Sequence, residues 1–234
     1  MTDTSKKLEA LYPFLHGKEK EPVSERESLL ESIRQKVAQS VSEKETFFAD
    51  NSEALIEVST AIAKVYREKH RMFSMGNGGS SCDAAHFAVE FQHPVTAGRP
   101  ALPCTSLTMD TAMISAVAND VGVDHIFSRQ IEALGQEGDG LIGFSTSGNS
   151  KNLIDAFRTA KKLGLSTIGM AGGDGGVMLS CGYLDFCLVA KTDSIHRVQE
   201  VHVTSYHIIW DLVHTLLADH RGLTAAEGDH EIRR

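Results

Sequence analysis

Two short segments rich in glycine and hydroxyl side chains have the composition needed to bind an oxygen-rich ligand. The first reads Gly76-Asn77-Gly78-Gly79-Ser80 and lies between a strand-like run and a helical stretch. Glycines let backbone N–H groups approach a ligand closely, and a helix N-terminus adds partial positive charge. The segment lacks the last glycine of a dinucleotide fingerprint and the Gly-Lys of a P-loop, so it matches neither nucleotide motif. A tight strand-to-helix turn without a ligand is the alternative here.

The second segment reads Ser145-Thr146-Ser147-Gly148-Asn149-Ser150 and directly precedes a predicted helix. Hydroxyl groups at a helix start supply neutral donors to a phosphate dianion, and the helix dipole assists them. Ser150 alone would be explained as a helix N-cap. Capping does not require this many hydroxyls, so the segment favours phosphate binding.

A histidine and a glutamate follow the glycine-rich segment on the same predicted helix. His86 and Glu90 are four residues apart and therefore share one helix face. Imidazole nitrogen and carboxylate oxygen at this spacing can hold one metal ion or act together on one substrate. A solvent-exposed pair would have the same spacing, so the two residues alone leave both interpretations open.

The last long helical stretch contains several amide and imidazole side chains among apolar residues. Gln199 and His207 are eight residues apart, roughly two turns, which predicts that both project into one cleft. His202 and His214 have no such partner at helical spacing, and we expect them to be interfacial or surface histidines.

Short apolar runs alternate with helical stretches through the rest of the chain, which is typical of a layered α/β domain with a parallel sheet. Strands are expected at 71–75, 102–107, 139–144, 166–171 and 184–189. Helices are expected at 81–93, 110–118, 124–135, 150–163 and 194–218. Ligands bind beyond the carboxyl ends of such strands, so the informative loops are 76–80, 145–150 and 172–176.

The two ends of the chain differ from this domain, which is expected to span 24–222. Residues 1–23 are polar and form a predicted arm, and 223–234 form a polar tail. Apolar residues at helical spacing within 29–41 and again within 55–65 predict two helices ahead of the sheet. Amphipathic helices in this position are often oligomerisation surfaces.

Bulk composition excludes several classes of function. The 234 residues carry 31 acidic and 23 basic side chains, a net charge of −8, which disfavours a nucleic-acid partner. No apolar run reaches the roughly 18 residues of a membrane span, so we expect no membrane partner. The four cysteines form no C-x-x-C pair and are interpreted as reduced thiols of a cytoplasmic protein.

Taken in order, the motifs resemble those of the bacterial phosphoheptose isomerases, which belong to the SIS (sugar isomerase) domain family. They are G-N-G-G-S, H-F-A-x-E, A-x-A-N-D ending at Asp120, F-S-R-Q, S-T-S-G-N-S and R-V-Q-E-V-H with His207 downstream. The resemblance spans about 54–220 and keeps the order and approximate spacing of the family's motifs.

The resemblance implies a three-layer SIS fold, a homotetramer with active sites at subunit interfaces, and one zinc ion per subunit. The family exchanges sedoheptulose 7-phosphate with D-glycero-D-manno-heptose 7-phosphate. The residues that match the family's metal-associated positions are His86, Glu90, Gln199 and His207. The matching substrate contacts are Asn77, Gly78, Gly79, Asn119, Asp120, Ser145, Thr146, Ser147, Ser150 and Gln199, with Ser80 as an additional contact.

Aldose–ketose exchange moves a proton between C1 and C2 through an enediol, and it requires a base, an acid and stabilisation of the developing oxyanion. Glu90 is the candidate base and His207 the candidate acid. A zinc ion held by imidazole nitrogens and carboxylate or amide oxygens would polarise the carbonyl group.

Two departures from the family pattern bear on the sugar. Pro94 stands near a position where family members commonly have arginine, so His93 or Arg99 is a possible replacement, and His196 stands where aspartate is often found. Isomerisation of another phosphorylated ketose is therefore an alternative. A non-catalytic SIS adaptor is a second alternative, which Glu90 disfavours, and a sugar-phosphate-sensing transcription regulator is a third.

Overall fold

The computed structural model describes residues 22–96 and 98–228 and contains a five-stranded parallel sheet. Its strands are β1 (Met72–Gly76), β2 (Cys104–Ser106), β3 (Gly140–Ser145), β4 (Ser166–Gly172) and β5 (Phe186–Ala190). They lie in the order β2-β1-β3-β4-β5, and all neighbouring pairs are parallel. Each of the five strands overlaps the run predicted for it, which confirms the expected fold class.

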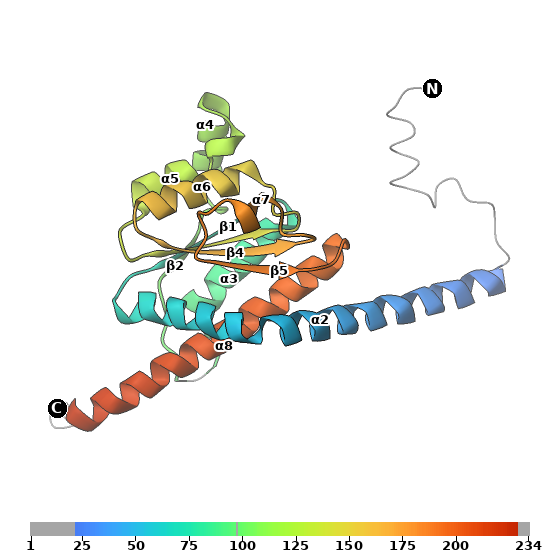
Figure 1. Ribbon diagram of the computed structural model, residues 1–234, viewed down its shortest axis with the longest axis horizontal. Coiled ribbons are helices and arrows are strands. Elements are labelled where there is room, and N and C mark those ends of the chain that lie inside the picture. Colours follow the sequence, from blue (N-terminus) through green and yellow to red (C-terminus); the bar gives the residue numbers. More distant parts are fainter. Residues whose placement is uncertain (1–21, 97, 229–234) are drawn as a thin grey trace. The chain divides into compact units, whose positions relative to one another are not determined.

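Helices cover both faces of this sheet (Figure 1). The elements are α3 (Gly79–Gln92), α4 (Thr111–Asp120), the 3-10 helix η2 (Val123–His125), α5 (Ser128–Leu134), α6 (Lys151–Lys162), α7 (Gly176–Ser180) and α8 (Ile195–Gly228). Sequence analysis predicted a helix at each of these places except α7, which is too short to show a helical periodicity. The helix predicted at 124–135 corresponds to two elements, η2 and α5.

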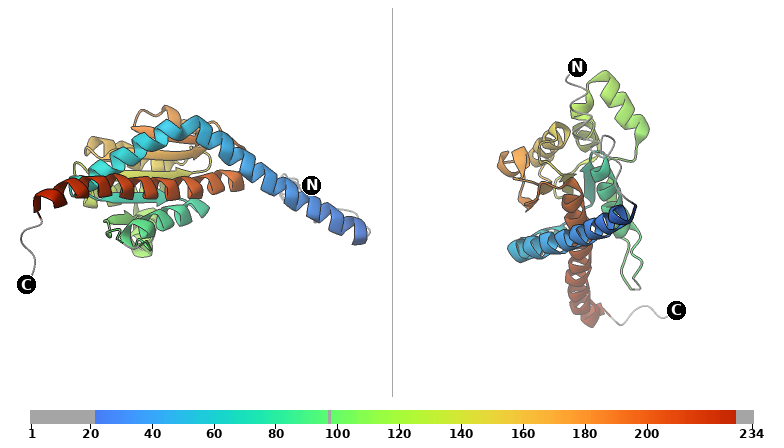
Figure 2. Two further views of the ribbon diagram at one scale, coloured as in Figure 1. Left: turned by 90° about the horizontal axis from the view of Figure 1, so that it is seen from below. Right: turned by 90° about the vertical axis from the view of Figure 1, so that its right-hand side faces the viewer.

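Alternate side chains of the strands feed two separate hydrophobic cores. Phe144 and Met170 pack with residues of α3, α8 and the last turns of α2 (Pro22–Arg67) on one face. Phe73 and Leu141 pack with residues of α4, α5, α6 and α7 on the other face. Viewed from below, α8 and the end of α2 lie over the sheet (Figure 2). The result is a helix–sheet–helix arrangement in three layers.

One continuous 46-residue helix replaces the two helices expected before the sheet. The prediction of a break was wrong because the segment between the two apolar stripes, 42–54, contains neither glycine nor proline. Polar residues alone do not interrupt a helix when nothing removes its backbone hydrogen bonds.

The chain divides into two units, Met1–Val41 and Ser42–Arg234. The described part of the first unit is helical, and its apolar residues Leu29, Ile33, Val37 and Val41 are more than half exposed. The predicted arm at 1–23 falls almost entirely outside the described residues. At the other end α8 continues to Gly228, beyond the predicted start of a polar tail at 223.

The strand order reverses direction between β1 and β3, because the chain leaves β1 toward β2 on one side and later continues from β3 toward β4 on the other. Open parallel sheets bind ligands at the carboxyl ends of the strands beside such a switch point. The glycine-rich segment follows β1 and the hydroxyl-rich segment follows β3, so both lie at this edge.

Candidate active site

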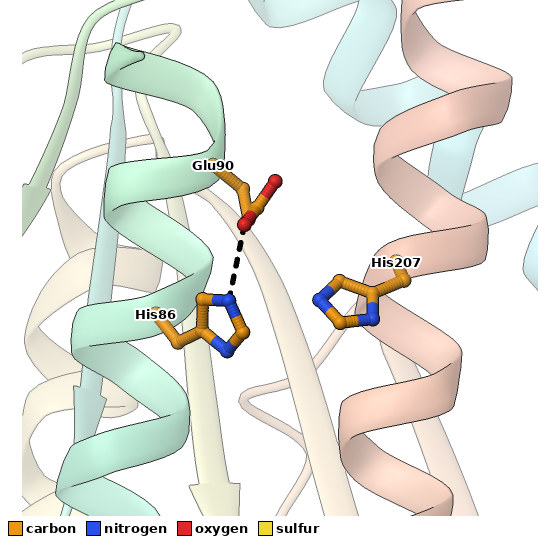
Figure 3. A group of neighbouring side chains, drawn as sticks. All are labelled: His86, Glu90 and His207. Atoms are coloured by element: carbon orange, nitrogen blue, oxygen red, sulfur yellow. Dashed lines mark hydrogen bonds and ion pairs between the residues drawn. The ribbon is translucent and has the colours of Figure 1, made fainter. Parts of the chain in front are cut away.

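Three side chains that sequence analysis singled out converge between α3 and α8. The potential ligand atoms of His86, Glu90 and His207 all lie within 4.8 Å of one another. His86 and Glu90 project from α3, and His207 points toward them from α8 (Figure 3). His86 Nε2 lies 3.0 Å from Glu90 Oε1. Two imidazole nitrogens and one carboxylate oxygen are a donor set that suits Zn²⁺, so the residues present fit the expected metal.

The packing of α3 on α8 brings these residues together. Trp210 Nε1 donates a hydrogen bond to the backbone oxygen of Glu90 at 2.8 Å, one turn beyond His207. The hydroxyl group of Tyr206 lies 2.7 Å from His86 Nδ1. Burial, followed by the nearby Asp83, Glu90 and Cys82, raises the pKa of the Tyr206 phenol well above its ordinary value, so this group keeps its proton.

Gln199 lies on α8 nearer its N-terminus than His207, beside the start of α3. A Cβ atom added at Gly79 would collide with the Gln199 amide nitrogen, which shows how closely that side chain covers the start of α3. An eight-residue separation corresponds to about 12 Å along a helix axis. The structure thus assembles three of the four expected metal ligands, and places Gln199 of the same chain about two turns from His207.

A hollow of about 460 Å³ opens beside Gln199, between the first turn of α3 and the first turns of α8. Its lining residues are Gly79, Cys82, Asp83, His196, Gln199, Glu200 and Val203. Burial raises the pKa of Asp83 to about 6, although the neighbouring His86 lowers it. Sequence analysis did not single out Asp83, because an acidic residue in the first turns of a helix is common.

The glycine-rich segment is anchored to the next loop by a pair of amide groups. Asn77 Nδ2 donates to Asn152 Oδ1 and Asn152 Nδ2 donates to Asn77 Oδ1, both at 2.9 Å. Gly78 has φ of +54°, a conformation that side chains with Cβ rarely adopt. Ser80 is buried beneath the turn. Asn152 was missed from the sequence, where it is one polar residue of a helix.

The hydroxyl groups after β3 bond to one another and to the loop backbone. Ser145 Oγ and Ser150 Oγ are 3.2 Å apart, and Ser145 Oγ accepts a hydrogen bond from Gly148 N at 3.1 Å. Ser150 occupies the N-cap position of α6 but makes no side-chain capping bond. Thr146 is half-buried and Ser147 is exposed in the loop before α6. The hydroxyl cluster is therefore not explained by capping.

Two further residues expected to contact the substrate, Asn119 and Asp120, belong to neither of these loops. Asn119 and Asp120 end α4, where Asn119 Nδ2 donates to Asp120 Oδ1 at 2.7 Å and both side chains are exposed. Their carboxylate and amide groups are accessible for a ligand.

Of the candidate replacements for a substrate-facing arginine, His93 is exposed, and Arg99 is held against α8. The Arg99 guanidinium stacks 4.3 Å from the centroid of the Trp210 ring and bonds Asp211 at 2.5 Å. His196 lines the hollow beside Gln199.

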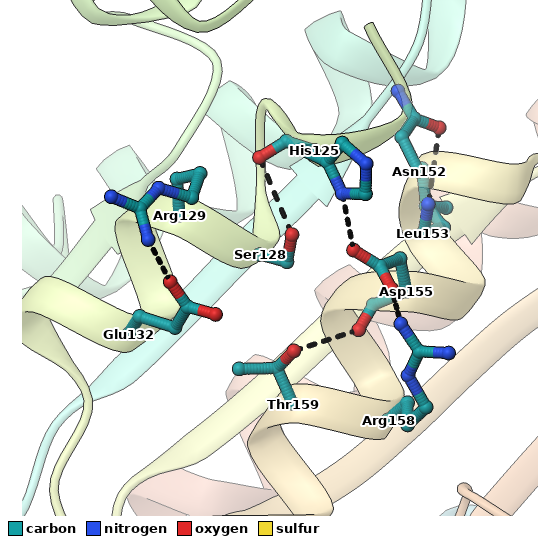
Figure 4. Close-up of polar contacts among 9 residues, drawn as sticks. All are labelled: His125, Ser128, Arg129, Glu132, Asn152, Leu153, Asp155, Arg158 and Thr159. Atoms are coloured by element: carbon teal, nitrogen blue, oxygen red, sulfur yellow. Dashed lines mark hydrogen bonds and ion pairs between the residues drawn. The ribbon is translucent and has the colours of Figure 1, made fainter. Parts of the chain in front are cut away.

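A second polar cluster joins η2 and α5 to α6 on the opposite face of the sheet (Figure 4). His125 Nδ1 lies 3.0 Å from Asp155 Oδ2, and Arg158 pairs with the other Asp155 oxygen. Burial alone would raise the pKa of Asp155, but hydrogen bonds from Ser128 and His125 and the charge of Arg158 lower it below its ordinary value. The cluster ties these helices together.

His202 and His214 are core residues, so the expectation that they lie at the surface or an interface was wrong. His202 is 0% exposed and His214 is 1% exposed. The ring of His202 lies near that of Phe144 of β3, and the ring of His214 stacks on that of Phe91 of α3. Burial lowers the pKa of His202 to about 4, although a hydrogen bond to the Ala171 carbonyl opposes the shift.

Comparison with known proteins agrees with this arrangement of loops and helices. Residues 36–172 match the SIS domain family. A phosphoheptose isomerase of Sulfurimonas denitrificans is 42% identical over 183 residues, covering 77% of this chain and 93% of that protein. A phosphoheptose isomerase of Thermodesulfovibrio yellowstonii is 40% identical over 187 residues, covering 80% and 92%.

Solved structures give the same result. The phosphoheptose isomerase of Neisseria gonorrhoeae superposes with a TM-score of 0.75 at 32% identity, covering 80% of this chain and 99% of that one. That of Francisella tularensis gives a TM-score of 0.73 at 32% identity, covering 80% and 98%. The chain belongs to the phosphoheptose isomerase family of SIS domain proteins. By this membership it is an enzyme of the aldose–ketose isomerase class.

The neutral, buried His202 predicts a loss of stability in acid. The unfolded state takes up a proton below pH 6.5, whereas the folded state does so only near pH 4, so stability falls as the pH drops through this interval. The contribution is about 1.4 kcal/mol per pH unit. Asp83, whose pKa is raised, changes stability in the opposite direction over part of the same range.

Comparison with His202→Gln separates the two effects, because glutamine can still donate to the Ala171 carbonyl. Urea unfolding between about pH 7 and pH 5 should show wild type losing about 2 kcal/mol relative to the variant. Parallel pH profiles for the two proteins would show that the buried imidazole does not control acid stability.

Proposed function

We propose that this enzyme interconverts sedoheptulose 7-phosphate and D-glycero-D-manno-heptose 7-phosphate through an enediol, with the help of one zinc ion per subunit. The observation that carries the proposal is the convergence of His86, Glu90 and His207 from two helices. It supplies a carboxylate, two imidazoles and a place for a metal ion at one point. The names of relatives up to 42% identical support the choice of sugar.

Glu90 acts as the base in this proposal. Its carboxylate takes a proton from C1 of the ketose, and the electron pair forms the C1–C2 double bond of the enediol. His207 donates a proton to the oxygen on C2. Glu90 then returns its proton to C2 while His207 takes the hydroxyl proton from the oxygen on C1, which becomes the aldehyde. The carboxylate and the imidazole lie within 4.8 Å, close enough to serve adjacent carbons.

His86, Glu90 and His207 would hold the zinc ion, which supplies Lewis-acid polarisation of the carbonyl group. The fourth expected ligand, Gln199, lies about 12 Å along α8 from His207. We therefore propose that a neighbouring subunit contributes its glutamine to each cluster. This arrangement agrees with the expectation, from the family resemblance, that the active sites lie at subunit interfaces.

The loop after β3 binds the phosphate group in this proposal. Ser147 is exposed in the loop before α6, where its Oγ accepts a hydrogen bond from Asn149 N at 3.2 Å and its O–H can donate to an approaching anion. The other hydroxyls of the phosphate loop are those of Ser145, Thr146 and Ser150. The remaining proposed sugar contacts are Asn77, Gly78, Gly79, Ser80, Asn119, Asp120 and Gln199.

A homotetramer and a cytoplasmic location complete the proposal. The exposed apolar residues of α2, among them Ile33 and Val37, give the helix a face suited to burial against another subunit. All four cysteines are free thiols, which suits a reducing compartment. None of the helices in the described part of the chain has a stretch long and apolar enough to cross a bilayer.

One observation favours a second candidate, the isomerisation of a different phosphorylated ketose. His196 lines the hollow beside Gln199, at a position where an imidazole would meet the sugar's hydroxyl groups. Turnover of purified protein with sedoheptulose 7-phosphate, followed by NMR with added zinc and after chelation, decides between the two. We expect the manno-heptose 7-phosphate to appear and the rate to fall on chelation. A folded protein that converts another ketose phosphate but not this one would refute the proposed substrate.

Glu90→Gln should lower kcat by at least about 100-fold, because a neutral amide cannot accept the C1 proton. Binding of inorganic phosphate, measured by calorimetry, should remain close to that of wild type. Glu132→Gln, which changes an exposed glutamate on α5, is the matched control and should retain full turnover. A Glu90→Gln enzyme with near-normal kcat would remove Glu90 from the role of base.

Ser147→Ala should raise KM for the sugar phosphate by about tenfold or more, because it removes a hydrogen bond to a charged group. The value of kcat should change less, since the reacting carbons lie elsewhere. Ser180→Ala, at the exposed end of α7, serves as the control. Steady-state kinetics with unchanged KM in Ser147→Ala would argue against this loop as the phosphate site.

A further inference from the structure

Tyr206 makes a contact to the metal cluster that the proposed chemistry does not use. Its hydroxyl oxygen lies 2.7 Å from His86 Nδ1, on the side of the ring opposite the nitrogen that faces Glu90. The tyrosine immediately precedes His207 on α8 and therefore points to a different side of that helix. Its hydroxyl group bonds one expected metal ligand while the next residue in the chain supplies another.

The phenol is fixed in position by the core. Tyr206 is 2% exposed. Its ring makes edge-on contacts with Phe87 and Phe144, with centroids 6.5 and 5.9 Å away, and with His207 at 4.9 Å. A side chain packed on several sides has few alternative rotamers, so the hydroxyl group stays where it meets His86.

A neutral imidazole carries one proton, and the position of that proton decides which nitrogen can bind a metal ion. His86 Nε2 faces Glu90 at 3.0 Å and is the nitrogen nearest the cluster. To bind a metal through Nε2, the ring must carry its proton on Nδ1, and that proton needs an acceptor. A phenol oxygen both donates and accepts hydrogen bonds, so Tyr206 can accept from Nδ1–H or donate to a bare Nδ1.

We propose that Tyr206 is a positioning residue for the metal site: its hydroxyl group holds the His86 ring in place and would accept a hydrogen bond from Nδ1–H when Nε2 binds zinc. The inference rests on the proposed zinc-dependent function. In it, the phenol hydroxyl group determines the ring orientation and the tautomer of one metal ligand, His86. Hydrogen bonds of this kind to ligating histidines typically change metal affinity by 10–100-fold.

The test uses the full-length metal-free protein and zinc in competition with a chromogenic chelator. Tyr206→Phe removes only the hydroxyl and keeps the packed ring, so we expect a zinc affinity about 10–100-fold below wild type. The melting temperature of the metal-free variant should stay close to that of wild type. Tyr66→Phe is the matched control, since it also removes a buried hydroxyl, one that has no partner among the described residues.

A double-mutant cycle shows whether Tyr206 acts through His86. In a His86→Ala background, loss of the phenol hydroxyl should leave the residual zinc affinity unchanged. Equal zinc affinity of wild type and Tyr206→Phe overturns the inference, and so does an equal loss of affinity in both backgrounds. Failure of wild type itself to bind zinc would instead refute the proposed metal site, on which the inference depends.

Discussion

The packing of α3 against α8 is the contact on which the candidate active site depends. Neither helix carries a complete set of reacting groups. Phe87 on α3 and Tyr206 on α8 both pack with Phe144 of β3, so the sheet fixes how the two helices meet. Trp210 then bonds the backbone of Glu90, which aligns the helices along their length. A shift of one turn, about 5.4 Å along the axis of α8, would separate His207 from its partners.

The two polar loops and the His86, Glu90 and His207 cluster lie on different parts of the fold. The two loops lie at the carboxyl ends of β1 and β3, beside the reversal of strand order where open parallel sheets bind ligands. The carboxylate and imidazoles lie farther along α3 and α8, on elements held by the core. Gln199 lies beside the start of α3, at the level of the glycine-rich loop and about two turns of α8 from His207.

Much of this arrangement follows from the sequence. All five strands fall within or beside short runs that were predictable from the alternation of apolar runs and helical stretches. His86 and Glu90 were predictable as a pair from their spacing, although only the position of His207 shows that they face a third donor. The family resemblance singled out His207 from the six histidines after residue 195.

Other features depend on packing that spacing does not encode. His202 was expected at the surface or at an interface because no partner at helical spacing accompanies it, yet it is fully buried and its ring lies near Phe144 of β3. Sequence analysis predicted two helices in place of α2 because the apolar stripe is interrupted between its two parts. The helical backbone itself continues through this segment. No sequence motif or spacing singled out Tyr206. Its proposed role follows only from the position of its hydroxyl group beside His86 in the structure.

The most direct test of the central claim is anomalous diffraction at the zinc edge from crystals of the full-length protein grown with zinc. The account predicts a peak at coordination distance, about 2.0–2.2 Å, from His86, Glu90 and His207 together. A zinc ion bound elsewhere, with these three side chains uninvolved, would contradict the assignment of this cluster as the centre of the active site.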